Sequence, residues 1–167
     1  PQKCYAYLVY EWWVRTFPQA EFKYVNAGIG GTTSQFGVAR AQDDLLDAEP
    51  DFVIAEFSVN DESTGHFEET YEGLVRKILS SKSHPALMLV HNVCYNNGAS
   101  AELVHSRIAR HYNIPSVSMQ STLYKALLNC RFDNRRITPD DLHPNDCGHE
   151  LVSMVITKRL EQIKNTV

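Results

Sequence analysis

Apolar and polar residues follow two periodicities along this chain, one typical of amphipathic helices and the other of short buried strands. Apolar positions three or four residues apart predict helices over residues 4–17, 35–48, 67–80, 101–112, 121–129 and 145–163. Compact apolar runs predict strands over residues 22–27, 51–58, 86–93 and 114–119, whereas the charged residues 131–140 carry neither pattern. Helices that alternate with strands predict one parallel sheet covered by helices on both faces.

The same patterns predict which side of each helix is buried. On the first helix the predicted buried stripe consists of Leu8, Val9, Trp12 and Trp13. On the helix over residues 67–80 it consists of Tyr71, Leu74, Val75 and Ile78. On the helix over residues 101–112 it consists of Leu103, Val104, Ile108 and Tyr112. These sets predict the helical faces that pack on the sheet.

The order of the elements is unusual because the chain begins with a helix. In a flavodoxin-like sheet, with strand order 2-1-3-4-5, the first strand lies in the centre. Without it, the predicted strands over residues 22–27 and 51–58 have no shared neighbour, and unpaired buried strand edges are costly. We therefore expect residues upstream of Pro1 to belong to the fold. Residues 1–167 would then form a single domain that is incomplete at its N-terminal side.

Composition narrows the range of partners. The 167 residues are 43% hydrophobic and carry a net charge of −4 with a sequence pI near 6.0. This balance gives no reason to expect a nucleic-acid or membrane partner. The four cysteines are widely spaced and form no C-x-x-C pair, which indicates reduced thiols. That pattern slightly favours the cytoplasm and leaves secretion open. No sequence pattern predicts an oligomeric state.

Ligands of open α/β sheets bind beyond the carboxyl ends of the strands. We expect three segments to lie there, two that follow predicted strands and one that precedes the last helix. They are residues 28–34, 58–61 and 138–144. In the last, Asp140 and His143 are spaced so that the carboxylate could accept the imidazole Nδ1 proton and leave Nε2 free as a base. The alternative without a catalytic role is a solvated turn in which Pro144 begins the final helix.

The two earlier segments offer hydrogen-bond donors. The amide of Asn60 could donate to an oxyanion, although an Asn-Asp pair also commonly initiates a turn. Gly31 could bring a backbone N–H close to a substrate, although Gly30-Gly31 also suits an ordinary turn. The glycine spacing does not match a dinucleotide-binding fingerprint.

Taken together and in this order, these segments resemble the SGNH hydrolase family, also called GDSL-like. Residues 26–34 (NAGIGGTTS) match its glycine block, residues 58–61 (SVND) its Gly-x-Asn-Asp block, and residues 140–144 (DDLHP) its Asp-x-x-His-Pro block. The following residues 145–149 (NDCGH) also look like the family. Ser58 stands where glycine is usual. The block with the nucleophilic serine is absent, and the helix over residues 4–17 is of the kind that follows it.

The resemblance implies a flavodoxin-like three-layer α/β/α fold and a serine ester hydrolase without cofactor or metal. It implies His143 as general base, Asp140 as its orienting acid, Gly31 and Asn60 as oxyanion-hole donors, and a nucleophile upstream of Pro1. The implied substrate is a small or carbohydrate ester, with short acyl groups such as acetyl. A protein of these 167 residues alone would then be inactive.

Three other interpretations compete with this one. The chain could be a non-catalytic SGNH-like domain that binds a carbohydrate or a protein partner. The ligand atoms concentrated in residues 140–149 could hold a metal ion, although their spacing matches no standard zinc pattern. A nucleotide-binding flavodoxin-like module is the third, and no phosphate loop supports it.

Overall fold

The computed structural model describes residues 4–166, which divide into two compact units. The first unit comprises residues 4–26, 95–97 and 119–166, and the second comprises residues 27–94 and 98–118. The parallel sheet belongs entirely to the second unit, whereas the first is helical. Among the described residues, no helix is both long enough and apolar enough to cross a membrane.

The sheet of the second unit has the strand order β1-β2-β3 and is parallel throughout. Its strands are β1 (Phe52–Ala55), β2 (Ala86–His91) and β3 (Ser116–Ser118). The register pairs Phe52 with Ala86 and Leu89 with Ser116. Parallel neighbours require a crossover connection, and helices supply it between each pair of strands. The carboxyl ends of the three strands therefore lie at the same end of the sheet, and the 58–61 segment follows the carboxyl end of β1.

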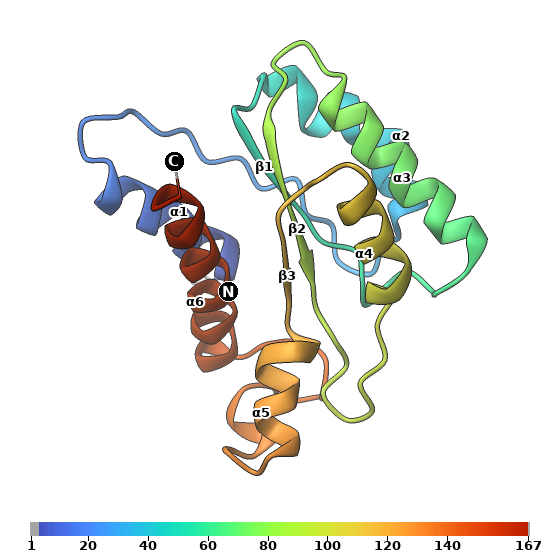
Figure 1. Cartoon of the computed structure of the whole chain (residues 1–167), viewed down its shortest axis with the longest axis vertical. Helices are drawn as coiled ribbons and strands as arrows, with labels where there is room; N and C mark the ends of the chain where they lie inside the picture. Colours follow the sequence, from blue (N-terminus) through green and yellow to red (C-terminus); the bar gives the residue numbers. More distant parts are fainter. Residues whose placement is uncertain (1–3, 167) are drawn as a thin grey trace. The chain divides into compact units, whose positions relative to one another are not determined.

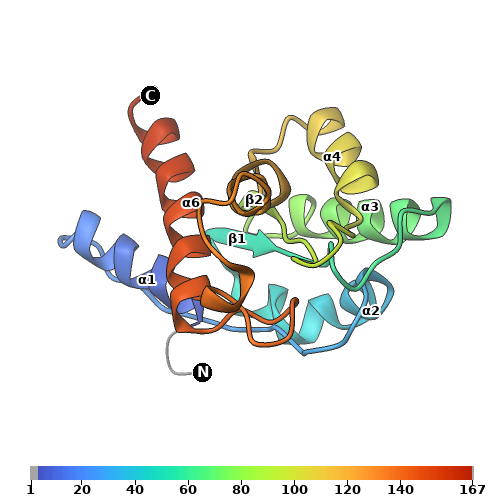
Figure 2. The same ribbon diagram turned by 90° about the horizontal axis from the view of Figure 1, so that it is seen from below.

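Three helices of the second unit cover the same face of the sheet, as Figures 1 and 2 show. They are α2 (Ser34–Asp44), α3 (Gly65–Leu79) and α4 (Glu102–His111), and a short 3-10 turn, η1 (Leu46–Ala48), follows α2. Alternate strand side chains face them, because successive residues of a strand point to opposite sides. The resulting core contains Val53, Ala55, Leu87, Leu89, Tyr71, Leu74, Val75, Ile78 and Ile108.

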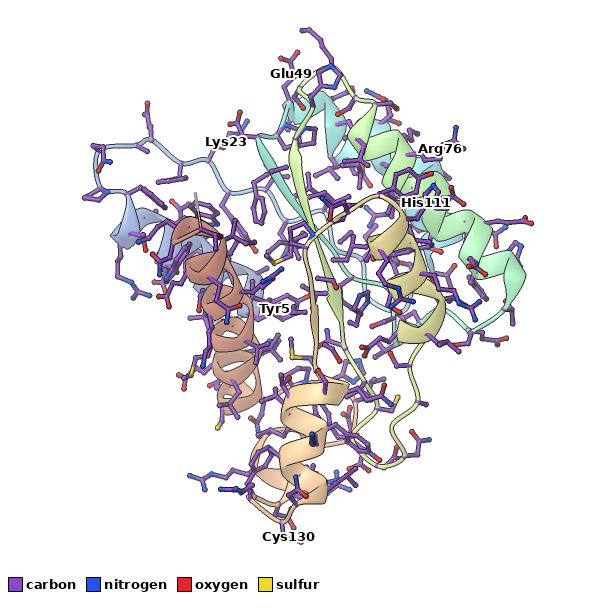
Figure 3. All side chains as sticks on the ribbon, viewed as in Figure 1. Tyr5, Lys23, Glu49, Arg76, His111 and Cys130 are labelled. Atoms are coloured by element: carbon purple, nitrogen blue, oxygen red, sulfur yellow. The ribbon has the colours of Figure 1, made fainter. Side chains whose placement is uncertain are left out.

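In the first unit, α1 (Tyr5–Thr16) and α6 (Asp146–Lys164) lie side by side (Figure 1). A π-helical turn, η2 (Gln120–Tyr124), leads into α5 (Lys125–Leu128), and a 3-10 turn, η3 (Asn134–Arg136), precedes the 138–144 loop. Tyr5, labelled in Figure 3, joins the two long helices because its backbone N–H donates to His149 Nδ1 at 3.2 Å.

Most predicted elements agree with the structure to within a few residues. The predicted helix over residues 35–48 ends earlier and continues as η1, and the predicted strands shorten to their hydrogen-bonded parts. All four cysteines are free thiols.

The predicted strand over residues 22–27 is wrong, because this segment pairs with no strand in residues 4–166. Its alternating apolar side chains pack on α1 instead. The Phe22 ring lies 6.2 Å from that of Trp13, and the Tyr24 ring lies 5.4 Å from that of Tyr10. An alternation of apolar and polar residues indicates which side chains are buried. An extended segment that packs on a helix has the same alternation without the hydrogen bonds of a sheet.

The predicted buried faces are confirmed for α3 and partly wrong for α4 and α1. On α3, Tyr71, Leu74, Val75 and Ile78 are all buried. On α4, Leu103 is 61% exposed and His105 is fully buried in its place. The buried stripe of α4 consists of Val104, His105, Ile108 and Ala109, so a polar residue occupies a core position that the apolar pattern assigned to a leucine. On α1 only Val9 is buried, and the other three predicted side chains are half-buried.

Candidate active site

The structure brings Asp140 and His143 together in the first unit. Asp140 Oδ2 accepts a hydrogen bond from His143 Nδ1 at 2.7 Å, and Oδ1 accepts from the backbone N–H of His143 at 2.8 Å and of Leu142 at 3.1 Å. The ring hydrogen bond, and then the two backbone donors, hold the pKa of Asp140 well below its usual range. The carboxylate therefore fixes the tautomer of His143 with the proton on Nδ1.

The second ring nitrogen of His143 is left available. The side chain is 76% exposed, and Nε2 makes no hydrogen bond to any residue in the described range 4–166. A neutral imidazole with Nδ1 protonated presents an acceptor lone pair at Nε2. The pair can therefore act as an oriented general base.

The loop that carries this pair is held by its neighbours. Asp141 has a left-handed backbone, with φ +71°, and its carboxylate accepts hydrogen bonds from Asn134 and Arg135. Its carbonyl accepts from the N–H of Tyr95 at 2.7 Å. The buried Thr138 contacts Asp140 through its hydroxyl. These contacts shape the loop independently of the His143 ring.

The start of α6 closes against the same loop. Asn145 caps the helix by accepting the Gly148 N–H at 3.0 Å, as an N-cap asparagine commonly does. A Cβ on Gly148 would lie 2.2 Å from the carbonyl oxygen of Ile137, so only glycine fits there. The Gly-His pair at 148–149 is thus explained by close packing and by the contact from His149 to Tyr5.

Gly31 lies in the second unit, in the loop before α2. Its φ is +71°, a conformation that favours glycine, and no atom lies within 4 Å of where a Cβ would stand. The Thr32 hydroxyl donates to the Ile29 carbonyl at 2.7 Å and closes the loop. The N–H of Gly31 has no hydrogen-bond partner among the described residues and is available to a ligand.

Asn60 also lies in the second unit, on a tight turn after β1. The backbone N–H groups of Asn60 and Asp61 both donate to the Phe57 carbonyl, at 3.1 and 2.9 Å. The Asn60 side chain is exposed and bonds to no other residue in the range 4–166. A side-chain amide that is held on a rigid turn, and whose N–H groups donate to no other described residue, can donate to an oxyanion.

Ser58 occupies the turn's usual glycine position and is fully buried. Its hydroxyl donates to Glu56 Oε1 at 2.7 Å and is within 3.0 Å of the Asn92 carbonyl oxygen. Burial raises the pKa of Glu56, against the opposing effect of the Ser58 donors. Ser58 is therefore committed to holding the turn, which explains how a serine substitutes for glycine here.

One buried pair escaped the sequence analysis. Asp61 and His105 are joined at 3.0 Å, and both side chains are fully buried. The sequence motifs single out Asn60 of the Asn-Asp pair, and the predicted buried stripe of the helix over residues 101–112 does not include His105. The sequence does contain one signal that His105 is buried, because His105 lies next to Val104 on the apolar face of α4.

The alternative of a metal site between residues 140 and 149 gains no geometric support. Within the described part of the chain, no three His, Cys, Asp or Glu side chains are placed to hold one metal ion. His149, one of the candidate ligands, accepts the Tyr5 N–H through Nδ1 and is buried.

Comparison with known proteins gives the family. The sequence profile of the GDSL-like Lipase/Acylhydrolase family matches residues 4–151. The chain belongs to this family. Among curated GDSL-like relatives, it is 26% identical over 158 residues to the Thioesterase 1/protease 1/lysophospholipase L1 of Escherichia coli strain K12, with 88% of this chain and 71% of that protein covered.

Solved structures of GDSL-like enzymes extend the comparison. A two-domain esterase (CEX) active on acetylated mannans, crystallised with mannopentaose, is 70% identical with a TM-score of 0.97. The match covers 99% of this chain, and this chain spans 45% of that protein's length. An acetylxylan esterase, Axe2 from Geobacillus stearothermophilus, is 20% identical with a TM-score of 0.76, over 93% of this chain and 80% of that one. The predicted SGNH family and its three-layer α/β/α fold class are confirmed.

Proposed function

We propose that this chain supplies the base and the oxyanion donors of a serine esterase that removes acetyl groups from a carbohydrate. The observation that carries the proposal is the 2.7 Å hydrogen bond between Asp140 Oδ2 and His143 Nδ1, with an Nε2 that bonds to no residue in the described range. A carbohydrate-binding domain without catalysis has no need of an oriented imidazole, so this pair favours an enzyme.

The proposed reaction has two halves. In the first, His143 Nε2 takes the proton of a serine Oγ as that oxygen bonds to the ester carbonyl carbon. The carbonyl oxygen becomes an oxyanion that accepts hydrogen bonds from the Gly31 N–H and the Asn60 amide. The C–O bond to the sugar then breaks, and His143 returns the proton to the leaving sugar oxygen. In the second half, water attacks the acetyl-serine in the same way and releases acetate.

We place the nucleophilic serine upstream of Pro1. Two serines in the family's blocks are already engaged, since Ser58 bonds to Glu56 and Ser34 lies within 2.7 Å of Thr70 Oγ1. Loss of a nucleophile alone costs about 10⁶-fold in one serine protease. A protein limited to residues 1–167 should accordingly release no acetate above background.

An acetylated mannan is the proposed substrate. The support is the 70% identity, over nearly the whole chain, to an esterase active on acetylated mannans. Because this chain spans 45% of that esterase, regions outside it can contribute to substrate choice there.

The test is acetate release from acetylated mannan by the parent protein, meaning the natural polypeptide that includes this chain. His143→Gln should lower kcat by at least about 10³-fold, because the base is lost. The matched control is His111→Gln, an exposed histidine at the end of α4 (Figure 3), which should retain the wild-type rate.

Two outcomes would overturn the proposal. Full activity of His143→Gln would remove His143 from the reaction. Binding of manno-oligosaccharide without any acetate release by the wild-type parent would favour the non-catalytic binding domain instead.

A further inference from the structure

The carboxylate of Asp61 is buried directly behind Asn60. Its side chain is 0% exposed, and Oδ1 accepts the backbone N–H of Ser34 at 2.8 Å. Ser34 is the first residue of α2, where the helix dipole favours a negative charge. Asp61 therefore ties the Asn60 turn to the end of the loop that carries Gly31.

His105 satisfies the other oxygen of that carboxylate. Its Nε2 lies 3.0 Å from Asp61 Oδ2, and its ring stacks on Tyr71 with centroids 3.6 Å apart and planes 13° apart. Because a carboxylate only accepts, Nε2 must carry the proton. His105 itself belongs to α4, whose first turn is anchored to the Asn60 turn by the Ala101 N–H, which donates to the Ser58 carbonyl at 2.7 Å.

Three segments of the second unit thus meet at one buried carboxylate: the Gly31 loop through Ser34, the Asn60 turn through Asp61, and α4 through His105. A buried charge without a partner is costly, so removing the His105 donor would drive Asp61 to rotate or draw in water. Either response releases the link to Ser34 or moves Asn60, its chain neighbour.

We propose that His105 is a positioning residue of the esterase, which acts through Asp61 to fix the spacing between the Gly31 N–H and the Asn60 amide. This inference rests on the proposed function for its catalytic consequence, since those two groups are the proposed oxyanion donors. Its structural content, the link from His105 through Asp61 to Ser34, stands without it.

The variants are a matched pair in the parent protein. His105→Met removes the donor and keeps a long side chain, whereas His105→Gln restores an N–H near the position of Nε2. His111→Met, on the exposed end of the same helix, controls for a helical histidine-to-methionine change (Figure 3). The measurements are kcat and KM with p-nitrophenyl acetate, and hydrogen exchange at the Ser34 N–H.

His105→Met should lower kcat about 10- to 100-fold, because small displacements of oxyanion donors are costly in the transition state. KM should change by less than about threefold, since the oxyanion forms only in the transition state. His105→Gln should recover most of the rate, and His111→Met should match the wild type. Exchange at the Ser34 N–H should accelerate in His105→Met alone.

Equal losses in the Met and Gln variants would overturn the proposal, because the Tyr71 stacking rather than the hydrogen bond would then matter. Wild-type kcat in His105→Met would overturn it as well. If the wild-type parent has no esterase activity, the proposed function fails, and exchange at Ser34 still decides the link. Should His105→Met not fold, the wild-type protein gives the answer by ¹H–¹⁵N correlation of the His105 ring. A protonated Nε2 is expected, and a proton on Nδ1 alone would refute the link.

Discussion

At the scale of single residues, the orientation of His143 depends on hydrogen bonds rather than on burial. Four donors converge on the Asp140 carboxylate, two from backbone, one from the ring and one from the Thr138 hydroxyl, while the side chains of Asp140 and His143 stay exposed. A solvated site can hold an imidazole in this way only if the loop is fixed by other contacts. The buried Thr138 and the Asp141 hydrogen bonds provide these contacts.

This account predicts different effects for two adjacent aspartates in the parent protein. Asp140→Asn should lower kcat by roughly 10²- to 10⁴-fold, because an amide can present its NH₂ to Nδ1 and favour the wrong tautomer. Asp141→Asn should cost less than about threefold, since asparagine tolerates the left-handed backbone and keeps an oxygen for Asn134 and Arg135. Steady-state kinetics of both variants make the comparison. Similar losses in the two would show that loop integrity, not the tautomer, sets the rate.

A second prediction concerns His91, at the end of β2. Burial, and secondarily the charge of His105, lower the pKa of His91 to about 4 from a usual value of 6.5. Between pH 6.5 and pH 4 the His91 ring is protonated in the unfolded chain and neutral in the folded chain. The resulting stability is therefore fully present above pH 6.5, and it is lost as the pH falls toward 4. The loss attributable to His91 should approach about 3 kcal/mol.

The measurement is urea unfolding at pH 7 and pH 4.5 of the wild type, His91→Leu and His111→Leu. Neither ring nitrogen of His91 has a hydrogen-bond partner among residues 4–166, so leucine breaks no bond there. His91→Leu should lose less stability on acidification than the wild type, whereas His111→Leu should follow the wild type. Parallel curves for all three proteins would contradict the assignment.

The sequence sufficed to predict Asp140, His143, Gly31 and Asn60 as candidates, because each lies in a short block with fixed spacing. In the structure a hydrogen bond joins Asp140 to His143, and the Gly31 N–H and the Asn60 amide have no partner within residues 4–166, while the catalytic roles of all four stay predictions. Asp61–His105 could not be predicted in the same way. Its two members are 44 residues apart, and only the packing of α4 brings them together.

At the scale of elements, the start of α6 shows how a glycine fixes the position of the 138–144 loop. Gly148→Ala should destabilise the protein by about 1–3 kcal/mol, because the new Cβ would meet the Ile137 backbone. Gly73→Ala, inside α3, should instead stabilise it by about 0.5–1 kcal/mol, since the nearest atom, Val38 Cγ2, is 3.8 Å away. Thermal melts should thus move in opposite directions. A shared direction would contradict the packing at Gly148.

Helices were predicted better than strands, for a physical reason. The helical stripe of α3 reads directly from the sequence, because its partners in the sheet impose one apolar face. A strand needs a hydrogen-bonded neighbour that the local sequence does not contain. Residues 22–27 have the alternation of a strand and pack on α1 without one, and the π-helical turn η2 was likewise read as ordinary helix.

At the scale of the whole molecule, the residues proposed for catalysis are divided between the two units. Asp140 and His143 belong to the first, and Gly31, Asn60 and the Asp61–His105 pair belong to the second. The family match covers residues 4–151 and includes all of them.

The central claim is that a serine upstream of Pro1 is activated by His143. The most direct measurement is fluorophosphonate labelling of the parent protein, followed by digestion and mass-spectrometric mapping of the label. The account predicts a label on one upstream serine that disappears in His143→Gln and persists in His111→Gln. A label on a hydroxyl within residues 1–167, or no label on a protein that does release acetate, would contradict it.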